Sequence, residues 1–384
     1  MLRSRLLCIA LLTAAACGDD DGPALDSGTP VDSGTPDGGG EPDAGQDGGV
    51  DAGMDAGPPG PPCAETLGLF ADSTCENVQE GILAYSPRFW LWSDATDKDR
   101  YIQLPEDSVI DTSDPDRWIF PVGTKIWKTF SLDGMRLETR VMEKTASGTG
   151  NFNWQFRTYR WNEDQSSVTE VVDGEMNVLG TGHDIPAQAA CTRCHGPAGG
   201  GSADAVLGFG TIQLAHTDTD TTLDTLDELG FLSAPVPASA GVVPGNAATV
   251  AALGYLHANC GHCHGTSRTI PAPGGGLGLW IETSQPLAEQ AAYRTAVRTP
   301  ANWRDPAMTR IPSESPQGVP SSSVFLRLGV RGRANAASRD GDRPHGGQRI
   351  LETWIREGEF PRYGRKAPRA RPSQVFDSTL RASP

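Results

Sequence analysis

Hydrophobic and polar residues alternate through much of the segment from residue 63 to residue 188. Short runs rich in aromatic and β-branched residues are separated there by Gly, Pro, Asp and Asn. A period of two is typical of a strand with one buried face. The pattern predicts an antiparallel, sandwich-like β-domain. Its expected strands cover residues 88–92, 118–120, 124–130, 136–142, 153–161 and 167–172.

Beyond residue 188 the chain changes to small residues, glycines and helical pieces. Residues 222–232 and 247–259 carry apolar side chains at three- and four-residue spacings, which predicts helices. The Pro-rich residues 233–244 between them are interpreted as a linker. The expected fold class is α+β and multidomain, a β-domain followed by mainly helical domains. A last helix at 347–358 would present Ile350, Leu351, Trp354 and Ile355 on one face.

The first 17 residues have the composition of an export signal. Arg3 and Arg5 precede an apolar run, and small residues follow before Cys17. The apolar run is too short to span a membrane. A cysteine directly after small residues resembles the lipobox of bacterial lipoproteins, which makes Cys17 the expected lipidation site; the alternative is an ordinary cleaved signal with an incidental cysteine. We expect an exported, membrane-anchored protein, periplasmic or at the cell surface.

Residues 18–62 consist of short units such as Asp-Ala-Gly, with eleven acidic residues and no basic one. Such a segment cannot bury enough apolar surface to fold, so it is predicted to be a disordered linker. It contributes most of the formal net charge of −16. The tail at 361–384 is locally basic, but no basic stripe is interleaved with aromatic residues, which argues against nucleic-acid binding.

Two Cys-x-x-Cys-His motifs carry the main chemical signal: Cys191-Thr-Arg-Cys194-His195 and Cys260-Gly-His-Cys263-His264. Each motif sets two thiols one helical turn apart, where they can add to the two vinyl groups of a haem. The histidine beside the second thiol can then ligate the iron from one side. The sequence therefore predicts two covalently attached haem c groups, with His195 and His264 as the proximal iron ligands.

Zinc binding and dithiol redox chemistry are the competing interpretations of these cysteines. A zinc ribbon places its two Cys-x-x-Cys pairs roughly 15–20 residues apart, whereas 65 residues separate Cys194 from Cys260. A redox dithiol does not call for a histidine after both pairs. Of the remaining cysteines, Cys8 leaves with the signal, and Cys63 and Cys75 are expected to form a disulfide in an oxidising compartment.

The predicted organisation follows from these features. Residues 1–17 form the signal, 18–62 the linker, 63–188 the β-rich domain, 189–240 the first haem-binding segment, 245–360 a cytochrome c-like second haem domain and 361–384 the tail.

Candidates for the distal iron ligands are few. His216 follows the first motif by 21 residues and is the candidate for the first iron. Met308 and His345 are the candidates for the second iron. The alternative for either site is an iron that is five-coordinate or bound to water.

A set of ordered sequence elements is found at residues 91–95, 120–130, 138–140, 159–162, 185–186, 207–214, 258–264 and 354–355. In these elements the chain resembles a family of exported bacterial two-haem c-type cytochromes, many of them lipoproteins of unassigned role. Members of this family usually supply a distal methionine from a Met-Pro-Pro type segment before the last helix. Residues 335–345 contain no methionine, so the resemblance implies that Met308 or His345 substitutes, or that the second iron has an open position.

Electron transfer between exported redox partner proteins is the leading functional expectation. The chain has no phosphate-binding loop, nucleophile elbow or dinucleotide fingerprint that would indicate another chemistry. The first alternative is a haem enzyme, peroxidase-like or dehydrogenase-associated, that uses an open coordination position on one iron. The second alternative makes the β-domain the functional module, binding a protein or a glycan.

Overall fold

The computed structural model describes residues 61–91, 96–196, 203–265, 276–299, 322–325 and 346–358. The chain divides into two units, Met1–Pro59 and Gly60–Pro384, and all described residues belong to the second. The predictions that concern the signal, Cys17, the linker, Met308, His345 and the tail lie outside the described residues.

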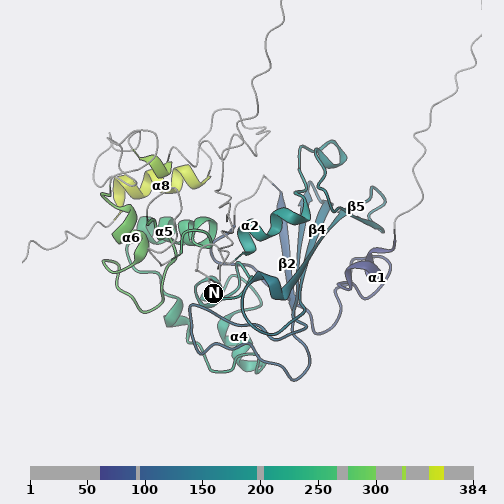
Figure 1. Ribbon diagram of the computed structural model, residues 1–384, viewed down its shortest axis with the longest axis horizontal. Helices are drawn as coiled ribbons and strands as arrows, with labels where there is room; N and C mark the ends of the chain where they lie inside the picture. Colours follow the sequence, from purple (N-terminus) through teal and green to yellow (C-terminus); the bar gives the residue numbers. More distant parts are fainter. Residues whose placement is uncertain are drawn as a thin grey trace, which may run out of the picture. The chain divides into compact units, whose positions relative to one another are not determined.

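The described residues form an α+β structure around one antiparallel sheet (Figure 1). Its six strands follow one another in chain order, so each strand pairs with its neighbours in sequence. Asp133 and Gly134, both with positive φ, form the two-residue turn between the third and fourth strands, as is typical of an Asp-Gly hairpin. The strands are β1 (Leu83–Ala84), β2 (Asp97–Gln103), β3 (Lys125–Leu132), β4 (Met135–Lys144), β5 (Trp154–Trp161) and β6 (Val168–Glu170).

Four of the six predicted strands are confirmed, because β3, β4, β5 and β6 overlap the runs at 124–172. The run at 88–92 is not a strand over its described part, residues 88–91. Its residue Phe89 packs instead against the helical core. The run at 118–120 makes only an isolated bridge. Strand β2 was not anticipated, because its sequence Asp-Lys-Asp-Arg-Tyr-Ile-Gln contains too many charged residues to display a clear apolar period.

The two faces of the sheet are covered by different segments and not by a second sheet, so the sandwich-like arrangement is not found among the described residues. On one face Trp127 and Trp161 pack against the N-terminal loop, which the Cys63–Cys75 disulfide closes. On the other face Ile126 and Met142 pack against the segment 205–236. Covering both faces removes enough apolar surface from water to stabilise the sheet.

Short helices follow the sheet in the chain, and the two longest pack against each other (Figure 1). Their shared core contains Leu253, Leu256, Leu351 and Trp354. The predicted helices at 247–259 and 347–358 are thereby confirmed. The helices are α1 (Cys63–Leu67), α2 (Cys191–His195), α3 (Thr211–Leu214), α4 (Leu223–Glu228), α5 (Ala247–Cys260), α6 (Ala291–Ala296) and α8 (Gly346–Glu357), with 3-10 turns η1 (Asn151–Asn153), η2 (Val178–Gly180), η3 (Gln188–Ala190) and η4 (Ala238–Gly241).

The close contact between α5 and α8 depends on a glycine. A Cβ atom at Gly347 would lie 2.2 Å from the hydroxyl oxygen of Tyr255 on α5, whereas a Cβ at the adjacent Gly346 would meet nothing within 4 Å. We expect Gly347→Ala to lower the free energy of unfolding by about 1–3 kcal/mol, the usual cost of overpacking. Gly346→Ala should leave it unchanged or raise it slightly. Urea denaturation of both variants measures this difference, and equal midpoints would contradict it.

The expected linker at 233–244 is packed against the rest of the unit. The backbone N–H of Thr112 donates to Ser233 Oγ at 2.9 Å, and the Thr112 hydroxyl donates to the carbonyl of Ala234 at 2.8 Å. Val236 and Val243 are buried. The chain therefore passes from the sheet to the helices without a free hinge at this position.

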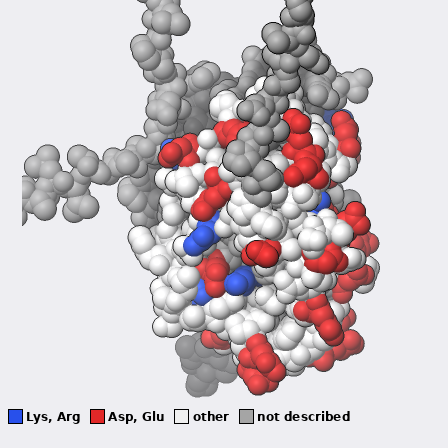
Figure 2. All heavy atoms as spheres, turned by 90° about the vertical axis from the view of Figure 1, so that its right-hand side faces the viewer, with Lys and Arg blue, Asp and Glu red and all other residues white. Residues whose placement is uncertain are grey.

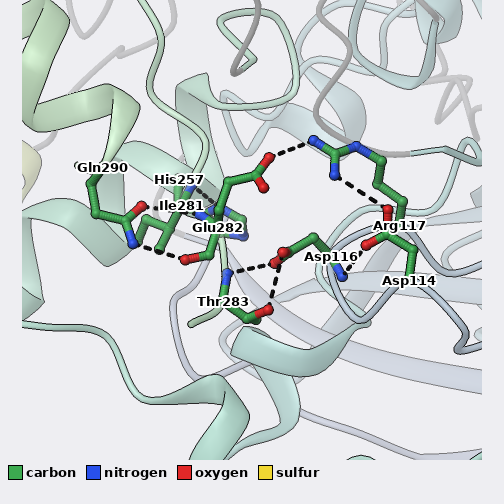
Figure 3. Close-up of polar contacts among 8 residues, drawn as sticks. All are labelled: Asp114, Asp116, Arg117, His257, Ile281, Glu282, Thr283 and Gln290. Carbon is green, nitrogen blue, oxygen red and sulfur yellow. Dashed lines mark hydrogen bonds and ion pairs between the residues drawn. The ribbon is translucent and has the colours of Figure 1, made fainter. Parts of the chain in front are cut away.

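A polar network joins the loop before β3 to the segment after the second motif (Figure 3). Arg117 pairs with Glu282 at 2.5 Å, and the carboxylate of Asp116 accepts hydrogen bonds from the backbone N–H of Thr283 at 2.8 Å and from its hydroxyl at 3.0 Å. Gln290 accepts from the backbone N–H of Glu282 at 3.0 Å. Burial raises the pKa of Asp116, and the bonds from Thr283 oppose that shift. These bonds hold the helical segment against the sheet segment.

The face of the molecule shown in Figure 2 carries many more Asp and Glu than Lys and Arg. This agrees with the acidic composition of the whole chain. In the part of the chain that the structure describes, no helix has the length and apolarity needed to cross a membrane.

Candidate haem sites

The first motif forms the short helix α2, which follows the 3-10 turn η3 directly. Its helical geometry sets Cys191 and Cys194 three residues apart on one turn, the spacing that two haem vinyl groups require. Cys194 is exposed and Cys191 is half-buried. Burial raises the pKa of the Cys191 thiol.

The imidazole of His195 is oriented by the backbone. Its Nδ1 lies 2.7 Å from the carbonyl oxygen of Ala205, and because a carbonyl can only accept, Nδ1 carries the proton. Burial, followed by the nearby charges of Lys128, His262 and Arg140, lowers the pKa of His195 to about 4. The ring is therefore neutral at neutral pH, and its Nε2 has the lone pair that an iron ligand needs.

Asp204 holds the segment that contains this carbonyl. Its buried carboxylate accepts hydrogen bonds from Lys144, from Trp154 and, at 3.1 Å, from the backbone N–H of Phe120. It also accepts from the N–H of Ala205 at 3.1 Å. The orientation of His195 thus depends on an ion pair buried under the sheet.

An open cavity lies between α2 and the sheet, and its empty volume of about 620 Å³ includes space open to solvent. His195 and Cys191 line it on one side, and the ring of His195 lies 5.3 Å from that of Phe156 on β5. Strand residues line the other side. The strand residues that give this side its cationic and apolar character are Arg100, Ile126, Lys128, Arg140, Met142 and Phe156.

These residues fit a haem. A haem presents a flat apolar ring with two propionate carboxylates at one edge, and this cavity offers apolar and cationic side chains together. Within the described part of the chain, one cationic group, Nη2 of the buried Arg100, has no hydrogen-bond partner. A buried guanidinium nitrogen without an acceptor is unfavourable, and a carboxylate in the cavity would satisfy it. Met142 is the one methionine that lines this cavity, and a thioether is among the side chains that ligate haem iron.

The second motif begins at the last residue of α5. The backbone N–H of His264 donates to the carbonyl of Cys260 at 2.7 Å, so the motif continues the helix by one turn. The carbonyl of His264 in turn accepts from the N–H of Leu279 at 2.6 Å. Cys260, the first residue of this turn, packs against the core that α5 shares with α8.

The two motifs touch. The thiol of Cys263 lies 3.5 Å from the carbonyl oxygen of Arg193, which is a middle residue of the first motif. The sequence offered no sign of this contact, because 65 residues separate the motifs. Contact alone would suit two neighbouring haems or a shared zinc ion. Among the described residues, no three or more His, Cys, Asp or Glu side chains gather as a metal site.

His216 is not among the residues that line the first cavity. Its Nε2 is 2.9 Å from the carbonyl of Ser86, and its Nδ1 accepts from the N–H of Asp218 at 3.3 Å. Both ring nitrogens therefore have protein partners, which favours a structural role. The distal candidates Met308 and His345 lie outside the described residues.

His257 and His262 line a second open cavity, together with Trp118 and Trp280, and its empty volume of about 570 Å³ includes space open to solvent. The Nδ1 of His257 accepts from the N–H of Ile281 at 3.1 Å, and burial lowers the pKa of His257 to about 3. This ring is locked in one orientation as part of the network in Figure 3. Leu207 lines both cavities.

Sequence reasoning missed the sheet side of the first site. Arg100, Lys128, Arg140 and Met142 all precede the motif in the chain and come from three separate strands. The sequence contained one indication of this site. Arg140 and Met142 are two residues apart on β4, so they face the same side of the sheet, and the charge of Arg140 therefore lies on a face that also carries a buried apolar side chain. Comparison with models of protein families, with curated proteins and with solved structures found no match. The resemblance to exported two-haem cytochromes stays a prediction.

Proposed function

We propose that this protein is a di-haem c-type cytochrome that transfers electrons between exported redox partners. The main observation behind the proposal is that two Cys-x-x-Cys-His turns lie in contact within one unit. The contact is between Cys263 of the second motif and Arg193 of the first. The cavity beside the first turn adds support, because its apolar and cationic lining suits a haem.

The protein residues have distinct roles in this proposal. Cys191, Cys194, Cys260 and Cys263 attach the two haems through thioether bonds, and His195 and His264 ligate the irons. A bound haem supplies one-electron exchange at its iron. The carbonyl of Ala205 holds His195 in the tautomer that leaves Nε2 available. Met142 replaces His216 as the candidate for the second ligand of the first iron.

The contact between the motifs has a consequence for electron flow. If a haem were bonded to each motif, the contact between the motifs would hold the two haem attachment points close together. The ion pair of Arg117 with Glu282 and the bonds from Thr283 to Asp116 keep the two segments from separating. We therefore expect electrons that enter at one haem to pass to the other within the same chain.

The proposed setting is outside the cytoplasm. Lipid on Cys17 and a flexible linker at residues 18–62 would tether the protein to a membrane and let it reach partner proteins. Cell fractionation tests this part: Cys17→Ser should move the protein from the membrane fraction to the soluble exported fraction.

A pyridine haemochrome assay on the full-length protein, matured by a c-type cytochrome system, tests the proposal. We expect two covalent haems per chain, and spectra of two six-coordinate irons that carbon monoxide does not change. A chain with no covalent haem would overturn the proposal. A haem that is high-spin and binds carbon monoxide would favour the alternative, a haem enzyme, and turnover of peroxide would then establish it.

A further inference from the structure

Three cationic side chains lie in one row across the sheet. Arg100 on β2 is paired with Lys128 on β3, and Lys128 is paired with Arg140 on β4. Directly paired residues project from the same face, and all three line the cavity beside the first motif. Like charges directly opposite one another are unfavourable. An anion bound beside this row would reduce the repulsion among the three charges.

One of the three charges is neutralised within the protein. Arg140 Nε lies 2.5 Å from Oε1 of the buried Glu138. Arg100 is only 5% exposed, and its Nη1 donates to the carbonyl of Lys98 at 3.1 Å. Its Nη2 has no hydrogen-bond partner among the described residues. Asp99 and Glu138 act on Arg100 and Lys128 through their charges, but within the described structure neither cation forms an ion pair, so both are available to a ligand in the cavity.

Lys128 is held in an environment that disfavours its charge. Burial, and then the charges of Arg100, Arg140 and Lys98, lower the pKa of Lys128 well below its usual value. Its ammonium lies over the ring of Phe130, 4.8 Å from the centroid, a contact that only partly replaces water. Carboxylates beside Lys128 would stabilise its charged form.

The neighbouring row of the sheet is apolar. Ile126, Met142 and Phe156 are paired across β3, β4 and β5, one step along the strands from the cations. All three line the same cavity. An apolar row beside a cationic row matches a haem lying against the sheet with its propionate edge over the cations.

We propose that Arg100 and Lys128 bind the two propionate carboxylates of the haem attached at Cys191 and Cys194. This inference rests on the proposed function. It assigns the sheet a specific task, which is to fix the orientation of the first haem about its attachment points. It also explains why these cations lie at a cavity in a molecule whose composition is acidic.

Resonance Raman spectroscopy of the propionate bending modes tests the inference. The full-length protein with Cys260→Ser and Cys263→Ser carries the first haem alone, so its spectrum has one source. We expect Lys128→Gln and Arg100→Gln each to shift these modes. Each should also lower the reduction potential, because losing a nearby cation disfavours uptake of an electron. The matched control is Lys125→Gln, on the same strand but the opposite face, paired with Glu143 at 3.9 Å.

The outcomes separate this inference from the function on which it rests. Propionate modes that stay unchanged in both Lys128→Gln and Arg100→Gln would overturn the inference while leaving a covalent haem in place. A wild-type protein without covalent haem would overturn the function instead. If the single-haem protein does not accumulate, difference spectra of the same variants in the two-haem protein supply the comparison. A shift of equal size in Lys125→Gln would also count against the cation row.

Discussion

Replacing both Cys191 and Cys194 by Ser should give a protein with one covalent haem in place of two. The thioether bonds form only at these thiols, so the second haem should remain and keep its own spectrum. The converse variant, Cys260→Ser with Cys263→Ser, should keep the first haem. Haemochrome absorbance divided by protein concentration measures the number of haems in each case, and a pair of single-haem proteins with different spectra is the expected result.

A matched control is available in the same chain. Cys63 and Cys75 form a disulfide that spans a separation of 12 residues and belongs to neither motif. Replacing both by Ser should leave two covalent haems and lower the free energy of unfolding by about 3 kcal/mol, the loop-closure contribution for a loop of this size. If the Cys191 and Cys194 double variant still carried two covalent haems, the assignment of the first motif would be wrong.

Asp204→Asn should lower the free energy of unfolding strongly, because it breaks a buried ion pair. The side chains of Asp204 and Lys144 are 0% and 1% exposed, and they form an ion pair. Removing the carboxylate charge leaves the ammonium buried without its counter-charge, which costs about 3–5 kcal/mol. Urea denaturation of the holoprotein measures the loss. Asp133→Asn, at an exposed turn position with φ of 51°, should stay within about 0.5 kcal/mol of the wild type.

The same substitution should also disturb the first iron. Asp204 accepts the N–H of Ala205, and the carbonyl of Ala205 orients His195. We expect the Asp204→Asn protein to contain a larger fraction of high-spin first haem, seen in the oxidised absorption spectrum. If Asp204→Asn lowered the free energy of unfolding but left the absorption spectrum unchanged, the expected role of Asp204 in positioning His195 would be wrong.

The proposed haem-attachment sites could be recognised in the sequence because the motif is local. Each motif contains two thiols and a histidine within five residues, and the helical turn that aligns them forms from those residues alone. The helices α5 and α8 were predictable for a similar reason, since their apolar spacing is visible in a single stretch of chain. The covalent chemistry of such a protein can therefore be proposed without a structure.

The residues that line the first cavity could not be predicted from the sequence, because they come from positions far apart in the chain. Arg100, Lys128 and Arg140 come together only through the pairing register of three strands. A shift of one residue in that register would turn each of them to the opposite face. His216 looked suitable by its position after the first motif, yet the fold gives both of its ring nitrogens other partners.

The sequence by itself thus determined the positions of the two Cys-x-x-Cys-His motifs, from which two haem sites are proposed, and predicted the two helices that form near the second motif. Only the tertiary structure decided that the two motifs touch at Arg193 and Cys263, and that a cationic row of the sheet faces the first motif. The physical reason is the range of the interactions. The spacing of thiols on a helical turn depends on neighbours in the chain, whereas charge compensation and the contact between the motifs depend on how strands and helices pack.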